Sequence, residues 1–174
     1  DFNGDGKSEY IVASRAASKQ IRLRIPYLST TTLTYTTSET ILVAANAESY
    51  SNIRVLAGNL DGDASDEIIL AWVDASFALN IVYYDTDGTL LPVFKTSIKD
   101  ETVLTKNYLN DWGIALNDLD GDNKAEVIIG FRPKTPGKGV YAKVYKLVNG
   151  NFVAKARKLI DNASLTSSSN ILTI

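Results

Sequence analysis

The sequence predicts an all-β fold of the β-propeller type, with about four antiparallel strands in each repeat. Three observations lead to this prediction. A short acidic loop recurs three times at nearly constant spacing, strand-like runs of alternating or continuous apolar residues fill the intervals, and none of the intervals carries a convincing helical period.

The acidic loops define the repeats. They begin at Asp1, Asn59 and Asp118, and each has Gly at its fourth place, Asp at its fifth and Glu at its ninth, followed by an apolar run. Acidic clusters that arose by chance would not keep this register. We therefore expect one domain made of three repeats, 1–58, 59–117 and 118–174.

Each repeat continues with a succession of strand-like runs. The run after the loop is short and apolar: YIVAS at 10–14, EIILAWV at 67–73 and EVIIGF at 126–131. The next run mostly alternates: QIRLRI at 20–25, LNIVYY at 79–84 and VYAKVYKL at 140–147. A more polar run follows: TTLTYTT at 31–37, LPVFKTSI at 91–98 and NFVAKARKL at 151–159. A leading strand then precedes the next loop: NIRVLAG at 52–58 and WGIALN at 112–117. Glycine-containing turn signals separate the runs: DTDG at 85–88, TPGKG at 135–139 and VNGN at 148–151.

The two ends of the chain are out of phase with the repeats. Residue 1 already lies in a loop, and SNILTI at 169–174 resembles the leading strand that begins SNIRVL at 51–56. Three repeats are fewer than the four to eight blades that close a ring. We expect an arc that is completed by further repeats of a parent chain, or otherwise by self-association. The absence of Met, even at position 1, favours a piece of a longer protein.

Composition excludes several classes of function. A net charge of −2 gives no basic surface for nucleic acid, and no apolar run is long enough to span a membrane. The chain has no Cys and no His, which removes thiol catalysis, disulfides, His-based triads and the usual zinc ligands. We expect a protein that is not an enzyme.

The acidic loops have the composition of calcium sites. Like charges at this spacing repel one another unless a cation lies among them. Side chains at places 1, 3, 5 and 9 can turn to one centre, with the backbone carbonyl of place 7 between them, and such hard oxygen ligands suit Ca²⁺. Gly at the fourth place, and Gly6 or Asn123 at the sixth, suit left-handed backbone. We expect up to three Ca²⁺ ions, one for each repeat.

The loops predict unequal sites. The third loop supplies four carboxylates and is expected to bind most tightly. The second has Asn59 at its first place and Ala64 where positive φ is preferred, a strain of about 1 kcal/mol, so it is expected to bind most weakly. Asp- and Gly-rich turns without metal remain the alternative. An EF-hand does not fit, because the twelfth place holds Val12, Leu70 or Ile129 and strands flank the loops.

The chain resembles the FG-GAP/VCBS repeat over its whole length. The resemblance rests on the motif D-x-[DN]-G-D-G-x-x-[DE], which is followed by an apolar strand and recurs at a spacing near 60. The resemblance implies a seven-bladed propeller, in some members six or eight blades, with Ca²⁺ in the loops. By position it implies these ligands, with the seventh place acting through its carbonyl: Asp1, Asn3, Asp5, Lys7 and Glu9; Asn59, Asp61, Asp63, Ser65 and Glu67; Asp118, Asp120, Asp122, Lys124 and Glu126. The Phe-Gly and Gly-Ala-Pro signature is absent, which favours the looser VCBS branch over integrin-type repeats.

The leading functional hypothesis is a recognition or adhesion module of an extracellular or cell-surface protein that binds a protein or a carbohydrate. Trp72, Tyr108 and Trp112 are candidate contact residues, with packing between blades as the alternative. A calcium-dependent polysaccharide lyase and a purely structural spacer are the other hypotheses. Loops of this kind fill at extracellular calcium levels, and Asn162 lies in an N-glycosylation sequon, DNAS at 161–164.

Overall fold

The computed structural model describes residues 1–16, 18–28, 35–37, 41–43, 52–86, 88, 90–101, 112–132, 139–155 and 158–161. Every element that these residues form is a β-strand, and all strand pairs are antiparallel. No helix of the described residues has the length and apolar character needed to cross a membrane. The predicted all-β class is therefore confirmed.

The second sheet has four strands in chain order, the first from the end of repeat 1–58 and the other three from repeat 59–117. Its strands are β6 (Arg54–Gly58), β7 (Glu67–Val73), β8 (Leu79–Asp85) and β9 (Val93–Asp100). These bounds agree closely with the four predicted runs. The third sheet has the same order, begins with a strand from the end of repeat 59–117, and has a fifth strand that pairs with β12: β10 (Trp112–Asn117), β11 (Glu126–Phe131), β12 (Val140–Val148), β13 (Asn151–Ala154) and β14 (Lys158–Asp161). The run predicted at 151–159 is thus divided between two strands.

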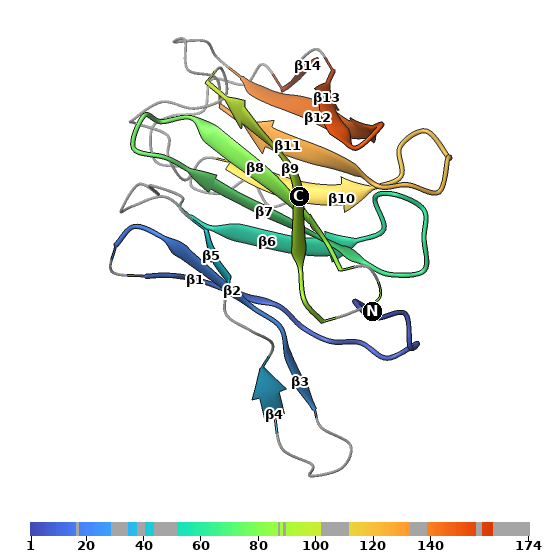
Figure 1. Ribbon diagram of the computed structural model, residues 1–174. Coiled ribbons are helices and arrows are strands. Elements are labelled where there is room, and N and C mark those ends of the chain that lie inside the picture. Colours follow the sequence, from blue (N-terminus) through green and yellow to red (C-terminus); the bar gives the residue numbers. More distant parts are fainter. Residues whose placement is uncertain are drawn as a thin grey trace.

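The first repeat departs from this order. β1 (Val12–Arg15), β2 (Ile21–Arg24) and β5 (Ile41–Val43) form a three-stranded sheet in the order β1-β2-β5. β3 (Pro26–Leu28) and β4 (Tyr35–Thr37) pair with each other in a separate hairpin (Figure 1). The predicted Thr-rich strand at 31–37 therefore contributes residues 35–37 to this hairpin and not to the sheet. The predicted SNILTI strand at 169–174 lies outside the described residues.

The three sheets are stacked, and the middle sheet is covered on both faces (Figure 1). One face carries Ile68, Leu70 and Trp72, which pack in a cluster with Ile21 and Leu23 of the first sheet. Residues on β7 alternate between the two faces, so both sets become buried, and all seven residues of β7 are buried. This explains why β7 reads as a continuous apolar run instead of an alternating one.

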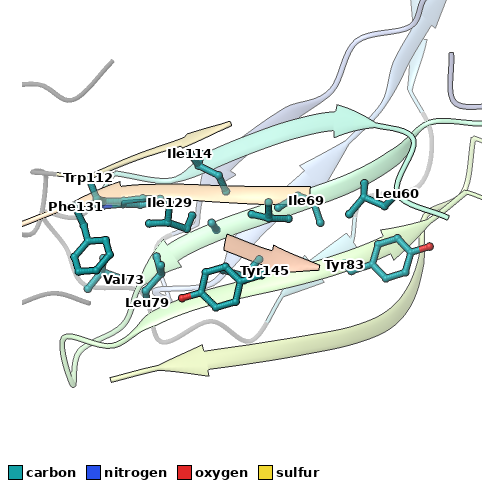
Figure 2. Packing of buried hydrophobic residues seen from close by; sticks show 13 residues of the cluster. Leu60, Ile69, Val73, Leu79, Tyr83, Trp112, Ile114, Ile129, Phe131 and Tyr145 are labelled. Atoms are coloured by element: carbon teal, nitrogen blue, oxygen red, sulfur yellow. The ribbon is translucent and has the colours of Figure 1, made fainter. Parts of the chain in front are cut away.

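The other face of the middle sheet packs against the third sheet. Figure 2 shows this cluster, in which Ile69 and Leu79 of the middle sheet lie with Trp112, Ile129 and Tyr145 of the third. Ile68 and Leu70 of the second sheet face the first sheet. Val127 and Ile129, which occupy the equivalent positions of the third sheet 59 residues later, face the second sheet. Equivalent faces of the second and third sheets therefore each meet the sheet before them. This packing is head to tail, and head-to-tail contacts can be continued by further copies.

Candidate metal centres

The three acidic loops turn on the same side of the molecule. The second loop, residues 59–67, joins β6 to β7; the third, residues 118–126, joins β10 to β11; and the first, residues 1–9, leads to β1 (Figure 1). Neighbouring loops share one repeated backbone bond. The N–H of Asp66 donates to the carbonyl of Asp1 at 2.9 Å, and the N–H of Ala125 donates to the carbonyl of Asn59 at 2.8 Å. The eighth place of each later loop is thus tied to the first place of the loop before it.

Within each loop, the side chain of the Asp at the fifth place accepts a backbone hydrogen bond from two residues later. Its Oδ1 accepts the N–H of the seventh-place residue in all three loops: Lys7 to Asp5 at 2.9 Å, Ser65 to Asp63 at 2.7 Å, and Lys124 to Asp122 at 3.1 Å. Such Asx turns explain why Asp recurs at this place. The Lys124 ammonium also donates to the carbonyl of Asp61, which links the third loop to the second.

The ninth-place glutamates connect the end of each loop to its start. Their Oε2 atoms accept the N–H of the second-place residue: Phe2 to Glu9 at 2.9 Å, Leu60 to Glu67, and Leu119 to Glu126 at 2.9 Å. Because each of these glutamates immediately precedes or begins an apolar run, the bond anchors the loop to a buried element. All three loops share this bond, which gives the Glu at the ninth place a structural role in each loop.

Two of these glutamates also present a second, buried oxygen. Oε1 of Glu67 is buried without a hydrogen-bond partner in the part of the chain that the structure describes, whereas the buried Oε1 of Glu126 lies 3.1 Å from the Lys146 ammonium. A buried carboxylate oxygen without a partner costs free energy, so it calls for a cation or a proton. Burial raises the pKa of Glu67 to about 7, and the nearby charges of Asp61 and Asp63 act in the same direction.

The second loop is the most complete centre. Asp61, Asp63 and Glu67 each place a carboxylate oxygen within 4.8 Å of the others, and Asp85 supplies a fourth. Asp85 lies at the end of β8 and is 5% exposed. The sequence pattern DTDG at 85–88 indicates only a turn at this residue, because its place opposite the loop follows from strand pairing.

Asn59, expected as a ligand of the second loop, has a role in closing that loop. Its Oδ1 accepts the N–H of Gly62 at 2.6 Å, and its amide nitrogen donates to the carbonyl of Asp63. Ser65 is buried. The strain expected at Ala64 is absent, because Ala64 is not among the described non-glycine residues with positive φ. The prediction of a weak second site thus loses its physical basis at that position.

The third loop brings together Asp118, Asp120 and Glu126, again with carboxylate oxygens within 4.8 Å of one another. Asp118 also accepts the N–H groups of Gly121 at 2.7 Å and Asn123 at 2.8 Å. Asp122 lies outside this group of oxygens, but its Oδ2 accepts a hydrogen bond from Lys146 at 2.8 Å.

The described first loop does not bring three carboxylates within that distance. Asp1 accepts the N–H of Gly6 at 2.7 Å, and Asn3 accepts the N–H of Asp5 at 3.1 Å. The backbone N–H of Lys7 lowers the pKa of Asp5, and the Lys7 ammonium lies 3.5 Å from its Oδ2. Ca²⁺ binding by Asp1, Asn3, Asp5, Lys7 and Glu9 stays a prediction.

The backbone of the loops agrees with the predicted glycine roles. The fourth-place glycines all have positive φ: Gly4 at 69°, Gly62 at 91° and Gly121 at 79°. At the sixth place, Gly6 has a φ of 79° and Asn123 a φ of 63°. The first and third loops therefore share a left-handed sixth residue, which the second loop does without.

The aromatic candidates for partner contact are buried where the structure describes them. Trp112 is 1% exposed and belongs to the cluster between the second and third sheets, with the Arg54 guanidinium 5.9 Å from its ring centre. Trp72 is 5% exposed and belongs to the cluster between the first and second sheets. Both residues serve packing in this structure. Tyr108 and Asn162 lie outside the described residues.

No protein-family model matches this chain, and neither a curated protein nor a solved structure does. The chemistry of the site follows from the loops themselves. Their donors are hard oxygens, which prefer Ca²⁺ or Mg²⁺ over softer metals. Opposite ligands of one Ca²⁺ ion are about 5 Å apart, so the oxygens of the second and third loops are close enough to share such an ion.

Proposed function

We propose that this chain is a calcium-stabilised β-propeller-type module of the FG-GAP/VCBS kind, which serves recognition or adhesion outside the cell. The observation that carries the proposal is the buried Oε1 of Glu67, which has no hydrogen-bond partner among the described residues and belongs to a group of four carboxylates. A divalent cation would satisfy that oxygen and remove the repulsion among the four groups.

The head-to-tail packing supports an arc of a larger assembly. On the third sheet, the face that would meet a following sheet carries Ile128, Ala142 and Val144, which remain partly exposed. The corresponding face of the middle sheet, with Ile69 and Ala71, is buried by its neighbour. Further blades of a parent chain would cover these residues in the same way.

A recognition role requires an exposed contact surface. Strand β9 offers one, because Val93 and Phe94 are 48% and 56% exposed and Leu91, just before the strand, is 52% exposed. Aromatic and aliphatic side chains at such a surface are typical anchors for a protein or carbohydrate partner. We propose no catalytic role.

The proposal is tested by calorimetric titration of the full chain with millimolar Ca²⁺, together with thermal unfolding in Ca²⁺ and in excess chelator. Ca²⁺ uptake and a higher melting temperature in Ca²⁺ would support it. No uptake and an unchanged melting temperature would refute calcium binding. Glycan arrays and pull-downs from extracellular material then test recognition, with Phe94→Ser as the matched surface variant.

A further inference from the structure

Asp85 and Lys146 occupy the same place in their two sheets. In the second sheet, Ile68 of β7 pairs with Tyr84 of β8. In the third sheet, Val127 of β11 pairs with Tyr145 of β12. Because the strands are antiparallel, the next residue of β8 or β12 lies opposite the ninth-place glutamate of the adjoining loop. That residue is an acid in one sheet and a base in the other.

In the second sheet this position completes the carboxylate group. Asp85 places an oxygen within 4.8 Å of oxygens of Asp61, Asp63 and Glu67. Oδ2 of Asp85 also pairs with the Lys95 ammonium at 2.8 Å. Oε1 of Glu67 remains buried, and it has no hydrogen-bond partner among the residues that the structure describes. The second loop thus holds an unsatisfied oxygen on a residue that is 0% exposed.

In the third sheet the same position introduces a positive charge. The Lys146 ammonium lies 2.6 Å from Oδ2 of Asp120, 2.8 Å from Oδ2 of Asp122 and 3.1 Å from Oε1 of Glu126. The ammonium is charged at neutral pH, and it neutralises the carboxylates that a divalent cation would otherwise bind.

We propose that the second loop, with Asp85 as a ligand supplied by a strand, is the tighter divalent-cation site, and that Lys146 is the built-in counter-ion of the third loop. A divalent cation enters the third loop only by displacing this ammonium. The inference rests on the proposed calcium binding, and it reverses the order of affinity that the residues of the loops alone predict.

The two centres differ in what a cation must replace. At the third loop, a cation displaces an ammonium that contacts three carboxylates, and each such charge-assisted contact is stronger than a neutral hydrogen bond. At the second loop, a cation supplies a partner to Oε1 of Glu67, which has none among the described residues. Affinity in calcium loops also rises with the number of charged ligands, and Asp85 adds one.

The test is calorimetric Ca²⁺ titration of the full chain in two backgrounds. Asp118→Asn with Asp120→Asn silences the third loop, and Asp61→Asn with Asp63→Asn silences the second. With the third loop silenced, Asp85→Asn should weaken the remaining tighter site by about 10-fold or more. With the second loop silenced, Lys146→Met should tighten binding at the third loop by about 10-fold or more.

Matched controls change the same net charge elsewhere. Lys158→Met and Glu101→Gln alter exposed side chains outside the loops and should leave both affinities within about twofold. The reciprocal exchange tests the same idea in both directions. Lys146→Asp should raise the Ca²⁺ affinity of the third loop, and Asp85→Lys should abolish tight Ca²⁺ binding at the second loop. Circular dichroism verifies folding, and the Lys146 variants decide the question if the Asp85 variants do not fold.

The outcomes separate this inference from the proposed function. If silencing the third loop removes the highest-affinity Ca²⁺-binding step from the titration, the inference is overturned and calcium binding itself stands. Unchanged affinity at the third loop in Lys146→Met would do the same. No uptake in any variant, including Lys146→Met and Lys146→Asp, would overturn calcium binding itself.

Discussion

The hydroxyl of Tyr145 on β12 donates a hydrogen bond of 2.6 Å to Oδ2 of Asp100 at the end of β9, and so joins two different sheets. Both residues are buried, and the Lys143 ammonium also pairs with Asp100. Burial, together with the Asp100 charge, raises the pKa of Tyr145 above its ordinary value, so the hydroxyl remains a donor. This contact fixes the third sheet against the second.

Tyr145→Phe should destabilise the chain by about 1–3 kcal/mol, because it removes a donor from a buried carboxylate and leaves the ring packing unchanged. Urea unfolding measures the effect. Tyr10→Phe, at a tyrosine that is 51% exposed, is the control and should cost less than about 0.5 kcal/mol. Equal stability of the two variants would show that the bond between the sheets adds little.

The calcium-free protein should lose stability as pH rises from about 5 to about 8. Burial, with repulsion from Asp61 and Asp63, raises the folded-state pKa of Glu67 from 4.5 to about 7. The folded state therefore holds this proton more tightly than the unfolded chain. Its contribution is present at pH values below about 4.5 and is lost as pH rises through about 7, at most about 3 kcal/mol.

Urea unfolding in excess chelator at several pH values checks this expectation, and the comparison with Glu67→Gln isolates the residue. The variant should show a flatter decline in stability, while Glu101→Gln, at an exposed position, should keep the wild-type slope. Parallel curves for wild type and Glu67→Gln would contradict the assignment. In saturating Ca²⁺ we expect the wild-type decline to diminish, since the ion binds the ionised carboxylate.

Gly62→Ala and Gly121→Ala form a matched pair at the fourth place of two loops. Both glycines have positive φ, so either alanine costs about 1 kcal/mol of backbone strain. A Cβ at position 62 would also meet Cε of Lys124 at 3.1 Å, whereas one at position 121 would meet nothing within 4 Å. Gly62→Ala should therefore be the more destabilising in thermal unfolding, because it disturbs the Lys124 bond to the second loop. A larger loss in Gly121→Ala would refute this account.

Trp112→Ala should unfold or strongly destabilise the chain, by about 3–5 kcal/mol, because the ring is almost completely buried between two sheets.

Phe94→Ser changes a side chain that is 56% exposed and should alter stability by less than about 1 kcal/mol. If β9 is the contact surface, Phe94→Ser weakens partner binding while the melting temperature stays nearly constant. Full partner binding by Phe94→Ser would remove β9 from the interface.

Much of the fold could be predicted from the sequence, because strand periodicity and loop spacing are local signals. The runs at 67–73, 112–117 and 126–131 coincide with β7, β10 and β11. The VNGN turn also forms as expected, with positive φ at Asn149 and Gly150 between β12 and β13. The first repeat was less predictable, because its polar Thr-rich run has no apolar face that would fix it to one sheet.

The sequence by itself determined the β-strands and the internal hydrogen bonds of the acidic loops, since these depend on residues only a few positions apart. Tertiary structure alone decided which charges enter each loop from outside it. Asp85 follows Glu67 by 18 residues, whereas Lys146 follows Glu126 by 20, so the repeat spacing does not align them. Only the pairing of β7 with β8 and of β11 with β12 places an acid beside one loop and an ammonium beside the other. Strand register sets these neighbours, and short-range sequence patterns carry no information about charges that approach from another strand.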